Sequence, residues 1–175
     1  VLDSEIGDAL RLDPDTVMSP DSPQAALRAA GAAVAAVDAV LAGEVDMAFC
    51  AVRPPGHHAT AGEAMGFCLF NNIAVAAAHA LSAHGLERVA ILDFDVHHGN
   101  GSQAIFEREP RLLFLSSHQS PLYPGTGAAS ETGVGNVRNA PLPPMSDGAA
   151  LRAAWREELL PAAAAFRPQL LLVSA

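Results

Sequence analysis

Residues 88–101 read Arg-Val-Ala-Ile-Leu-Asp-Phe-Asp-Val-His-His-Gly-Asn-Gly, and this stretch decides the fold. Its apolar first half predicts a buried strand over 88–94, and its second half turns polar where that strand ends. If the backbone stays extended, Asp93, Asp95 and His97 share one face, because side chains alternate along a strand. The carboxylate of Asp95 and the imidazole of His97 can provide two ligands of a zinc site. Asp93 could lie behind them and orient a histidine by accepting its ring N–H. An ion pair or a capped strand end is the alternative.

Apolar runs elsewhere in the chain extend the same pattern. Further strands are predicted over 47–52, 112–116 and 170–173, and helices over 23–43, 72–84, 102–108 and 147–166. Continuous apolar strands that alternate with helices indicate a parallel sheet with helices on both faces, the three-layer α/β arrangement. Asp21 or Ser22 is expected to cap the first helix, and Pro161 to kink or split the last one. A long loop is expected over 117–146, and loops of that length are usually functional.

A second group of reactive side chains follows the predicted strand 47–52. Residues 53–59 read Arg-Pro-Pro-Gly-His-His-Ala, which puts His57 and His58 just past the carboxyl end of that strand. Ligands of open parallel sheets bind beyond the carboxyl ends of the strands, so both groups fall at one edge. A histidine near its intrinsic pKa moves protons at neutral pH, although an exposed pair without a role is the alternative. Together the two groups indicate metal-assisted hydrolysis.

The composition narrows the range of partners. The chain has 175 residues, is 50% hydrophobic and 17% charged, and carries a net charge of −9, as expected for one globular domain. It contains no lysine and no basic stripe, so phosphate-mediated binding of nucleic acid is not expected. An acidic surface suits a cationic partner such as a lysine-rich tail or a polyamine, although solubility alone also explains it.

The cysteines and the apolar segments bear on the compartment. Cys50 and Cys68 lie in apolar runs without a Cys-x-x-Cys motif, which favours buried free thiols in a reducing compartment. Residues 1–5 lack the features of a signal peptide, and no apolar stretch of about 18 residues is free of charge or histidine. We therefore expect a cytoplasmic protein without membrane contact. The alanine-rich, lysine-free composition suggests a GC-rich bacterial genome.

These motifs give the sequence a family resemblance. It resembles the zinc-dependent histone deacetylases, a family that also includes the acetylpolyamine amidohydrolases. The matching stretches are Asp15-Thr16, Arg53–Ala59, Gly66-Phe67-Cys68 with Asn71 and Asn72, Asp93–Gly101, and Tyr123–Gly127. They cover nearly the whole chain, and asparagine at position 100 favours the class II branch and its bacterial relatives. The resemblance implies an arginase/deacetylase-like fold.

The resemblance also implies the metal ligands. Asp95 and His97 are expected to be two of three protein ligands of a catalytic zinc. A potassium ion is expected near Ser116, with Asp93, Asp95 and His97 contributing. The family's third zinc ligand, an aspartate, and its oxyanion-stabilising tyrosine are expected beyond Ala175, and a further segment before the first residue. The 175 residues are therefore expected to be part of a single catalytic domain, inactive alone.

For catalysis, the resemblance implies hydrolysis of an acyl amide. His58 is expected to be the general base and acid, with His57 as its electrostatic companion. Asp93 is expected to orient His57, and Asn100 to stand behind His58. The expected substrate is an acetylated lysine in a protein or an acetylated polyamine.

The resemblance places substrate contacts in two loops. Gly66 and Phe67, together with Tyr123, are expected to shape a narrow tunnel for the acylated side chain. Oligomeric state is open, a homo-oligomer included.

Two other functions stay open at this point. One is a ureohydrolase-like enzyme with two manganese ions, which would need further aspartates around its metal histidines; Val96-His97-His98 does not supply them. The other is a non-catalytic acyl-lysine binder, whose mark would be loss of His58 or Asp95, and both are present. Metal identity and stoichiometry would separate the readings.

Four residues outside the motifs carry smaller expectations. His79 and His84, at the end of a predicted helix, are expected to be surface residues or partners of the helix dipole. His118 begins the long loop, and a structural role is favoured over substrate contact. Cys68 has no basic partner in sequence and is expected to pack rather than react.

Overall fold

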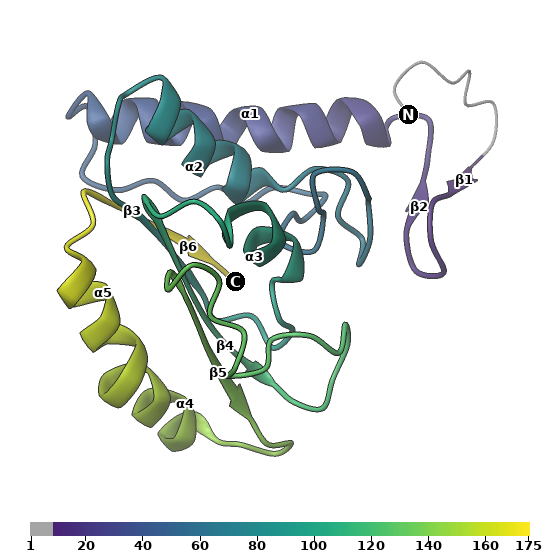
Figure 1. The fold of residues 1–175 in the computed structure, drawn as a ribbon. Helices are drawn as coiled ribbons and strands as arrows, with labels where there is room; N and C mark the ends of the chain where they lie inside the picture. Colours follow the sequence, from purple (N-terminus) through teal and green to yellow (C-terminus); the bar gives the residue numbers. More distant parts are fainter. Residues whose placement is uncertain (1–8) are drawn as a thin grey trace.

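The computed structural model describes residues 9–175, which form a sheet between two helical layers (Figure 1). The sheet is parallel, in the order β5 (Val137–Leu142), β4 (Leu112–Gln119), β3 (Val89–Asp93) and β6 (Leu170–Ser174). One face carries α1 (Ser22–Leu41), α2 (Asn72–Ser82) and α3 (Asn100–Phe106). The other face carries α4 (Gly148–Ala154), the π-helical turn η1 (Trp155–Leu159) and α5 (Leu160–Phe166). The predicted three-layer α/β fold is confirmed.

Burial on both faces explains the continuous apolar strands. Val89 and Ile91 of β3 join the core beneath α1, α2 and α3, whereas Ala90 joins the core beneath η1 and α5. Leu159 and Ala163 close that second core from the outer helices. Because consecutive side chains point to opposite faces, a strand covered twice needs apolar residues at every position.

The helix ends follow local chemistry. α2 begins where the Asn71 side chain accepts the N–H of Ala74 at 3.1 Å, and Gly85, with φ +67°, follows its end. α1 begins at Ser22 as predicted, but its N-cap Asp21 makes no side-chain cap bond. By length and composition alone, α1 is also a helix that could cross a membrane. In the fold it lies along α2.

The predicted strand over 47–52 is wrong. Residues 47–52 have no strand structure, and the side chains of Met47 and Phe49 are 83% and 93% exposed. The Val52 N–H bonds to the nearby Cys50 carbonyl instead of to a neighbouring strand. A strand exists only where a neighbour completes its backbone hydrogen bonds, and in the described part of the chain the sheet ends at β6.

Two more differences concern segments expected to be irregular. β5 lies inside the predicted long loop, and β1 (Leu10–Arg11) pairs antiparallel with β2 (Val17–Met18) near the start of the described chain. Pro161 does split the last helix, as predicted. Proline has no N–H to offer the carbonyl four residues earlier, and the helix widens into η1, where Leu160 N–H bonds to Trp155. The expectation about residues 1–5 lies outside the described residues.

Candidate active site

The predicted site residues meet at the carboxyl ends of β3 and β4. Asp93 ends β3, and its register partner on β4 is Ser116; both are fully buried. The loop that contains His57 and His58 passes over the same strand end, because the N–H of Ser102 at the start of α3 bonds to the His57 carbonyl at 3.1 Å. The two motifs therefore lie side by side, as expected, although the strand predicted over 47–52, from which this was inferred, does not form.

His57 forms a buried pair with Asp93. Its Nδ1 lies 2.9 Å from Oδ2 of Asp93, and its Nε2 lies 4.0 Å from Oδ1 of Asp95. A carboxylate oxygen accepts, so His57 Nδ1 carries the proton. Burial alone would lower the pKa of His57, but the hydrogen bond and charge of Asp93, with Asp95 adding, raise it. The expected contact between Asp93 and His57 is present.

His58 has a different environment. Its Nδ1 lies 2.8 Å from Oδ1 of Asn100, whose amide nitrogen is turned toward the His58 carbonyl and the Met65 sulfur. An amide oxygen only accepts, so His58 Nδ1 donates and the lone pair of Nε2 stays free. Burial, followed by the neighbouring charge of His57, lowers the pKa of His58. The contact expected between Asn100 and His58 is present.

Asp95 and His97 lie together, although not through strand alternation. The strand ends at Asp93, and side-chain turns follow: Asp95 N–H bonds to Oδ1 of Asp93, and His97 N–H to Oδ1 of Asp95. His97 Nδ1 lies 3.2 Å from Oδ1 of Asp95. That separation matches two ligands of one tetrahedral zinc at ~2.0–2.1 Å each, so the pair fits such a metal.

Hydrogen bonds from the start of α2 hold the loop that contains the two histidines. Buried Asn71, the N-cap of α2, donates to the Ala59 carbonyl at 3.0 Å and lies 3.2 Å from the Ser102 hydroxyl. At Gly101 an added Cβ would collide with the backbone of Ala59. Only glycine lets α3 approach the loop this closely. These contacts fix the backbone on which the two histidines are placed.

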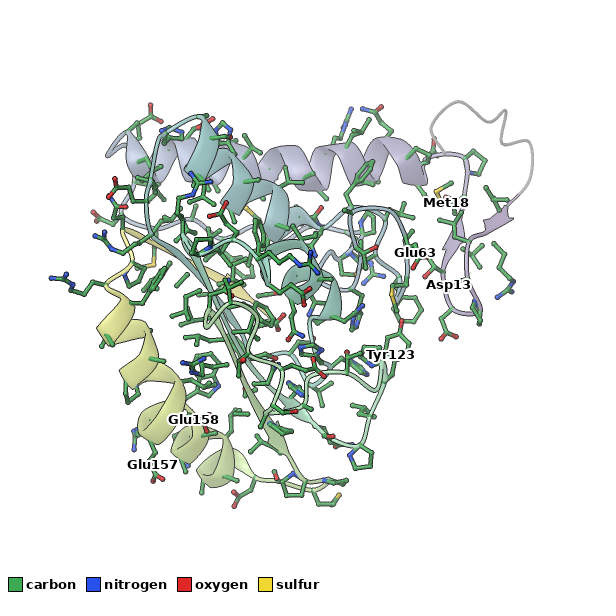
Figure 2. The ribbon with its side chains drawn as sticks, in the orientation of Figure 1. Asp13, Met18, Glu63, Tyr123, Glu157 and Glu158 are labelled. Carbon is green, nitrogen blue, oxygen red and sulfur yellow. The ribbon has the colours of Figure 1, made fainter. Side chains whose placement is uncertain are left out.

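Two of the three expected substrate contacts, Gly66 and Tyr123, lie against His58, and Phe67 follows Gly66 directly in the chain. Gly66 has φ +56°, and a Cβ there would strike the His58 ring. The Tyr123 ring lies edge-on, 5.1 Å from that of His58 between centroids. Phe67 is 61% exposed with φ +67°, and its N–H bonds to the Thr16 hydroxyl. Figure 2 shows Tyr123 on the side of the β1–β2 hairpin, near Asp13.

Ser116 is placed to accept a cation. The Gly127 carbonyl accepts from Nε2 of His118 at 3.0 Å, so Nδ1 of His118 accepts from the Ser116 hydroxyl at 2.9 Å. Both lone pairs of the serine oxygen stay free, which fits the potassium ion that the resemblance implies. His118 is 2% exposed and held at both nitrogens, in agreement with a structural role.

A buried polar layer behind the site was missed from the sequence. His98 is 1% exposed and bridges the Thr126 hydroxyl and Oε1 of Gln103, at 2.8 and 3.0 Å. Burial, followed by the charge of His118, lowers the pKa of His98 to about 4. Gln103 also donates to Glu131. The repeated histidine in the motif was the available signal, but nothing in the sequence identified its partners.

Comparisons with known proteins identify the family. Residues 3–175 match a family model described as "Histone deacetylase domain". The protein slr0245 of Synechocystis, described as uncharacterized, is 50% identical over 165 residues, covering 94% of this chain and 54% of its own length. The histone deacetylase-like amidohydrolase of Pseudomonas aeruginosa is 48% identical over 168 residues, covering 93% and 44%. The crystal structure of the HDA15 HD domain matches with TM-score 0.90 and 41% identity, over 95% of this chain and 51% of that one. The chain thus spans about half the length of the curated relatives it matches.

Proposed function

The chain belongs to the histone deacetylase family, and on that premise we propose that the protein carrying it hydrolyses acyl amides on lysine side chains or polyamines. The observation that carries this proposal is the state of His58. Its Nδ1 donates to the side-chain oxygen of Asn100, so the proton of the neutral ring is on Nδ1. The lone pair of Nε2 is therefore free to take a proton. A free imidazole lone pair beside a metal-ligand pair is what amide hydrolysis needs.

We expect the metal to be zinc, with Asp95 and His97 as ligands. When bound, zinc supplies Lewis acidity for a carbonyl and lowers the pKa of water. The third protein ligand is proposed to lie outside these 175 residues. Among residues 9–175, the one group of three or more candidate ligands with mutually close ligand atoms is Asp38, His79 and His84, remote from Asp95. A potassium ion is expected at Ser116.

Proton transfer and its electrostatic support are assigned to the two histidines of the 53–59 loop. His58 Nε2 accepts a proton from the attacking water and returns it to the leaving amine. His57, bonded to buried Asp93, keeps its ring in place 4.0 Å from the His58 ring between centroids. There it acts as the electrostatic companion, because Asp93 and Asp95 favour its charged form.

The proposed substrate is an extended acylated amine. Tyr123 stands edge-on to His58 and His97, and exposed Phe67 follows Gly66, whose backbone touches the His58 ring. A thin aliphatic chain ending in an amide suits aromatic walls of this kind, whether it belongs to lysine or to a polyamine. The net charge of −9 favours the cationic groups that accompany both substrates.

Activity of the full-length protein tests the assignment. An acetyl-lysine peptide and an acetylated polyamine would be offered to the wild type, to His58→Ala, and to Arg108→Ala as an exposed control. Loss of the general base should lower kcat/KM by roughly 10²–10⁴-fold, with Arg108→Ala unchanged. Near wild-type activity of folded His58→Ala would refute the assigned role.

Zinc binding by the 175-residue chain tests the ligand set. We expect the part of the binding that depends on Asp95 to be weak and substoichiometric, and to disappear in Asp95→Ala. Tight, one-to-one binding that needs Asp95 would mean that the third ligand is within the chain. Two manganese ions lost together in Asp95→Ala would instead favour the ureohydrolase-like alternative.

A further inference from the structure

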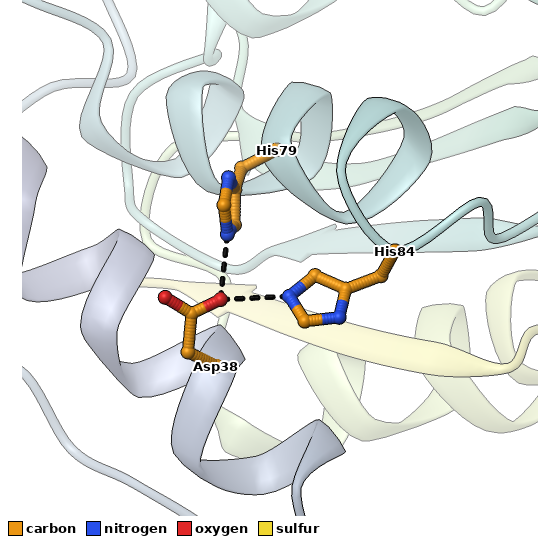
Figure 3. Close-up of side chains that lie close together, drawn as sticks. All are labelled: Asp38, His79 and His84. Carbon is orange, nitrogen blue, oxygen red and sulfur yellow. Dashed lines mark hydrogen bonds and ion pairs between the residues drawn. The ribbon is translucent and has the colours of Figure 1, made fainter.

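A second group of metal-ligand side chains lies far from the active site. Nε2 of His79 is 2.6 Å and Nε2 of His84 is 2.7 Å from the same oxygen, Oδ1 of Asp38 (Figure 3). The candidate ligand atoms of the three residues lie within 4.8 Å of one another. His84 comes just before β3, so this group lies toward the amino ends of the strands, whereas Asp95 and His97 lie at the carboxyl ends.

The backbone around the group is fixed by helix geometry. Asp38 is in the last turn of α1, where its carbonyl accepts the Ala42 N–H at 2.9 Å. His79 is in α2, and its carbonyl accepts the Ala83 N–H at 2.8 Å. Beyond the helix, Leu86 N–H bonds back to the Ala80 carbonyl, a C-terminal turn that needs the positive φ of Gly85. This turn returns His84 toward α1, so two packed helices bring the three side chains together.

The side chains match a transition-metal site in type and direction. Two imidazole nitrogens and one carboxylate oxygen are ligands that zinc takes, with water in the remaining position. Zinc ligands at ~2.0–2.1 Å stand ~3.3 Å apart, so each imidazole nitrogen would need to move ~0.6–0.7 Å away from the Asp38 oxygen. The side chains of His79, His84 and Asp38 are 26%, 31% and 51% exposed, which leaves them free to make that adjustment and leaves room for water.

We propose that Asp38, His79 and His84 form a surface site for a divalent transition metal, with zinc as the best-suited ion, which ties the end of α1 to the end of α2. This site does not depend on the proposed function, since it shares no residue with the active site. The competing reading is a metal-free cluster in which both histidines donate to Asp38. The two readings differ in zinc binding and in stabilisation by zinc.

The test uses Zn²⁺ alone and the full chain carrying Asp95→Ala, so that the active-site pair cannot contribute its carboxylate. Calorimetric titration should show one Zn²⁺ per chain. Adding His79→Gln, His84→Gln or Asp38→Asn should weaken zinc binding at least ~10-fold. Removing a residue that only hydrogen-bonds to a metal ligand already lowers metal affinity by that factor, and these three are proposed to be ligands themselves. Asp46→Asn, which removes an exposed carboxylate near the end of α1, should leave the isotherm unchanged.

A second measurement separates binding from tethering. Zn²⁺ should raise the melting temperature of the Asp95→Ala chain and have no such effect in the His84→Gln version. X-ray absorption of the loaded chain should show two imidazole nitrogens at ~2.0–2.1 Å. Isotherms that are the same across all variants, absence of zinc binding in the Asp95→Ala chain, or a zinc shell without imidazole would each overturn the site. Circular dichroism of the metal-free variants checks that they fold.

Discussion

Replacing Asn71 with alanine should release the loop that contains His57 and His58. The Asn71 side chain contacts this loop and is buried. Its Oδ1 caps α2 through the Ala74 N–H, and its Nδ2 bonds to the Ala59 carbonyl and the Ser102 hydroxyl. The cap is worth ~1 kcal/mol and each buried bond ~1 kcal/mol. We therefore expect Asn71→Ala to lower the free energy of unfolding by about 3 kcal/mol.

The neighbouring residue offers a matched control. Asn72 is also asparagine, but its side chain makes a single bond, from Nδ2 to the Pro54 carbonyl at 3.0 Å. Asn72→Ala should therefore cost ~1 kcal/mol or less. Asn71→Asp keeps an oxygen for the cap but sets a second acceptor, on a buried carboxylate, against the Ala59 carbonyl, so it should cost at least as much as Asn71→Ala.

Urea denaturation followed by circular dichroism measures these differences, with the m-value checked for constancy. Hydrogen exchange should show faster amide exchange at Ala59 and Ser102 in Asn71→Ala, and unchanged exchange in β3. If Asn71→Ala and Asn72→Ala lost the same free energy, the argument from counted buried bonds would be refuted.

Three further outcomes are expected. Gly66→Ala should abolish the proposed deacetylase activity of the full-length protein, because the added Cβ would strike the His58 ring. Gly43→Ala, also at positive φ but with open space around it, should cost ~1–3 kcal/mol of strain and leave kcat/KM unchanged. Asp147→Ala should destabilise by ~1 kcal/mol because its side chain caps α4 through two N–H groups, while Asp21→Ala, whose side chain makes no cap bond, should be near neutral in the same urea titration. Burial raises the pKa of the Cys68 thiol to about 11, so maleimide labelling near neutral pH should spare Cys68 until urea unfolds the chain; labelling in the native state would contradict its burial.

The sheet was predictable where a strand is buried on both faces. Residues 89–92 are apolar, Val89, Ala90 and Ile91 are fully buried, and β3 forms over Val89–Asp93. The run at 47–52 is equally apolar but has no strand beside it among residues 9–175, and it forms no strand. β5 was missed for the opposite reason: its residues are Val-Arg-Asn-Ala-Pro-Leu, polar and interrupted by Pro141, as an edge strand tolerates. Apolar runs reveal burial, whereas a strand also needs a partner, which a single sequence does not show.

The active site was predictable as two motifs but not as a network. The end of β3 located Asp95, whereas the strand predicted before His58 does not form, so His58 reaches the same edge for a different reason than predicted. The family resemblance paired His58 with Asn100. The partners of His98 and His118 come from segments far along the chain, so spacing could not identify them. Likewise, His79 and His84 were placed on the surface, but the convergence on Asp38 depends on how α1 packs on α2.

The tryptophan that links the outer helices to β4 is an intrinsic fluorescence probe of that contact. Trp155, in the π-helical turn η1, is the single tryptophan, and its indole N–H donates to the Ser117 hydroxyl at 2.8 Å. Its fluorescence emission should move to longer wavelength when this helical layer separates from the sheet and water reaches the indole. Tyr123, the single tyrosine of these 175 residues, lies beside His58, so in the 175-residue chain excitation transfer from Tyr123 to Trp155 joins one donor to one acceptor. Movement of the Tyr123 loop relative to the outer helices of this chain would therefore be visible without any label.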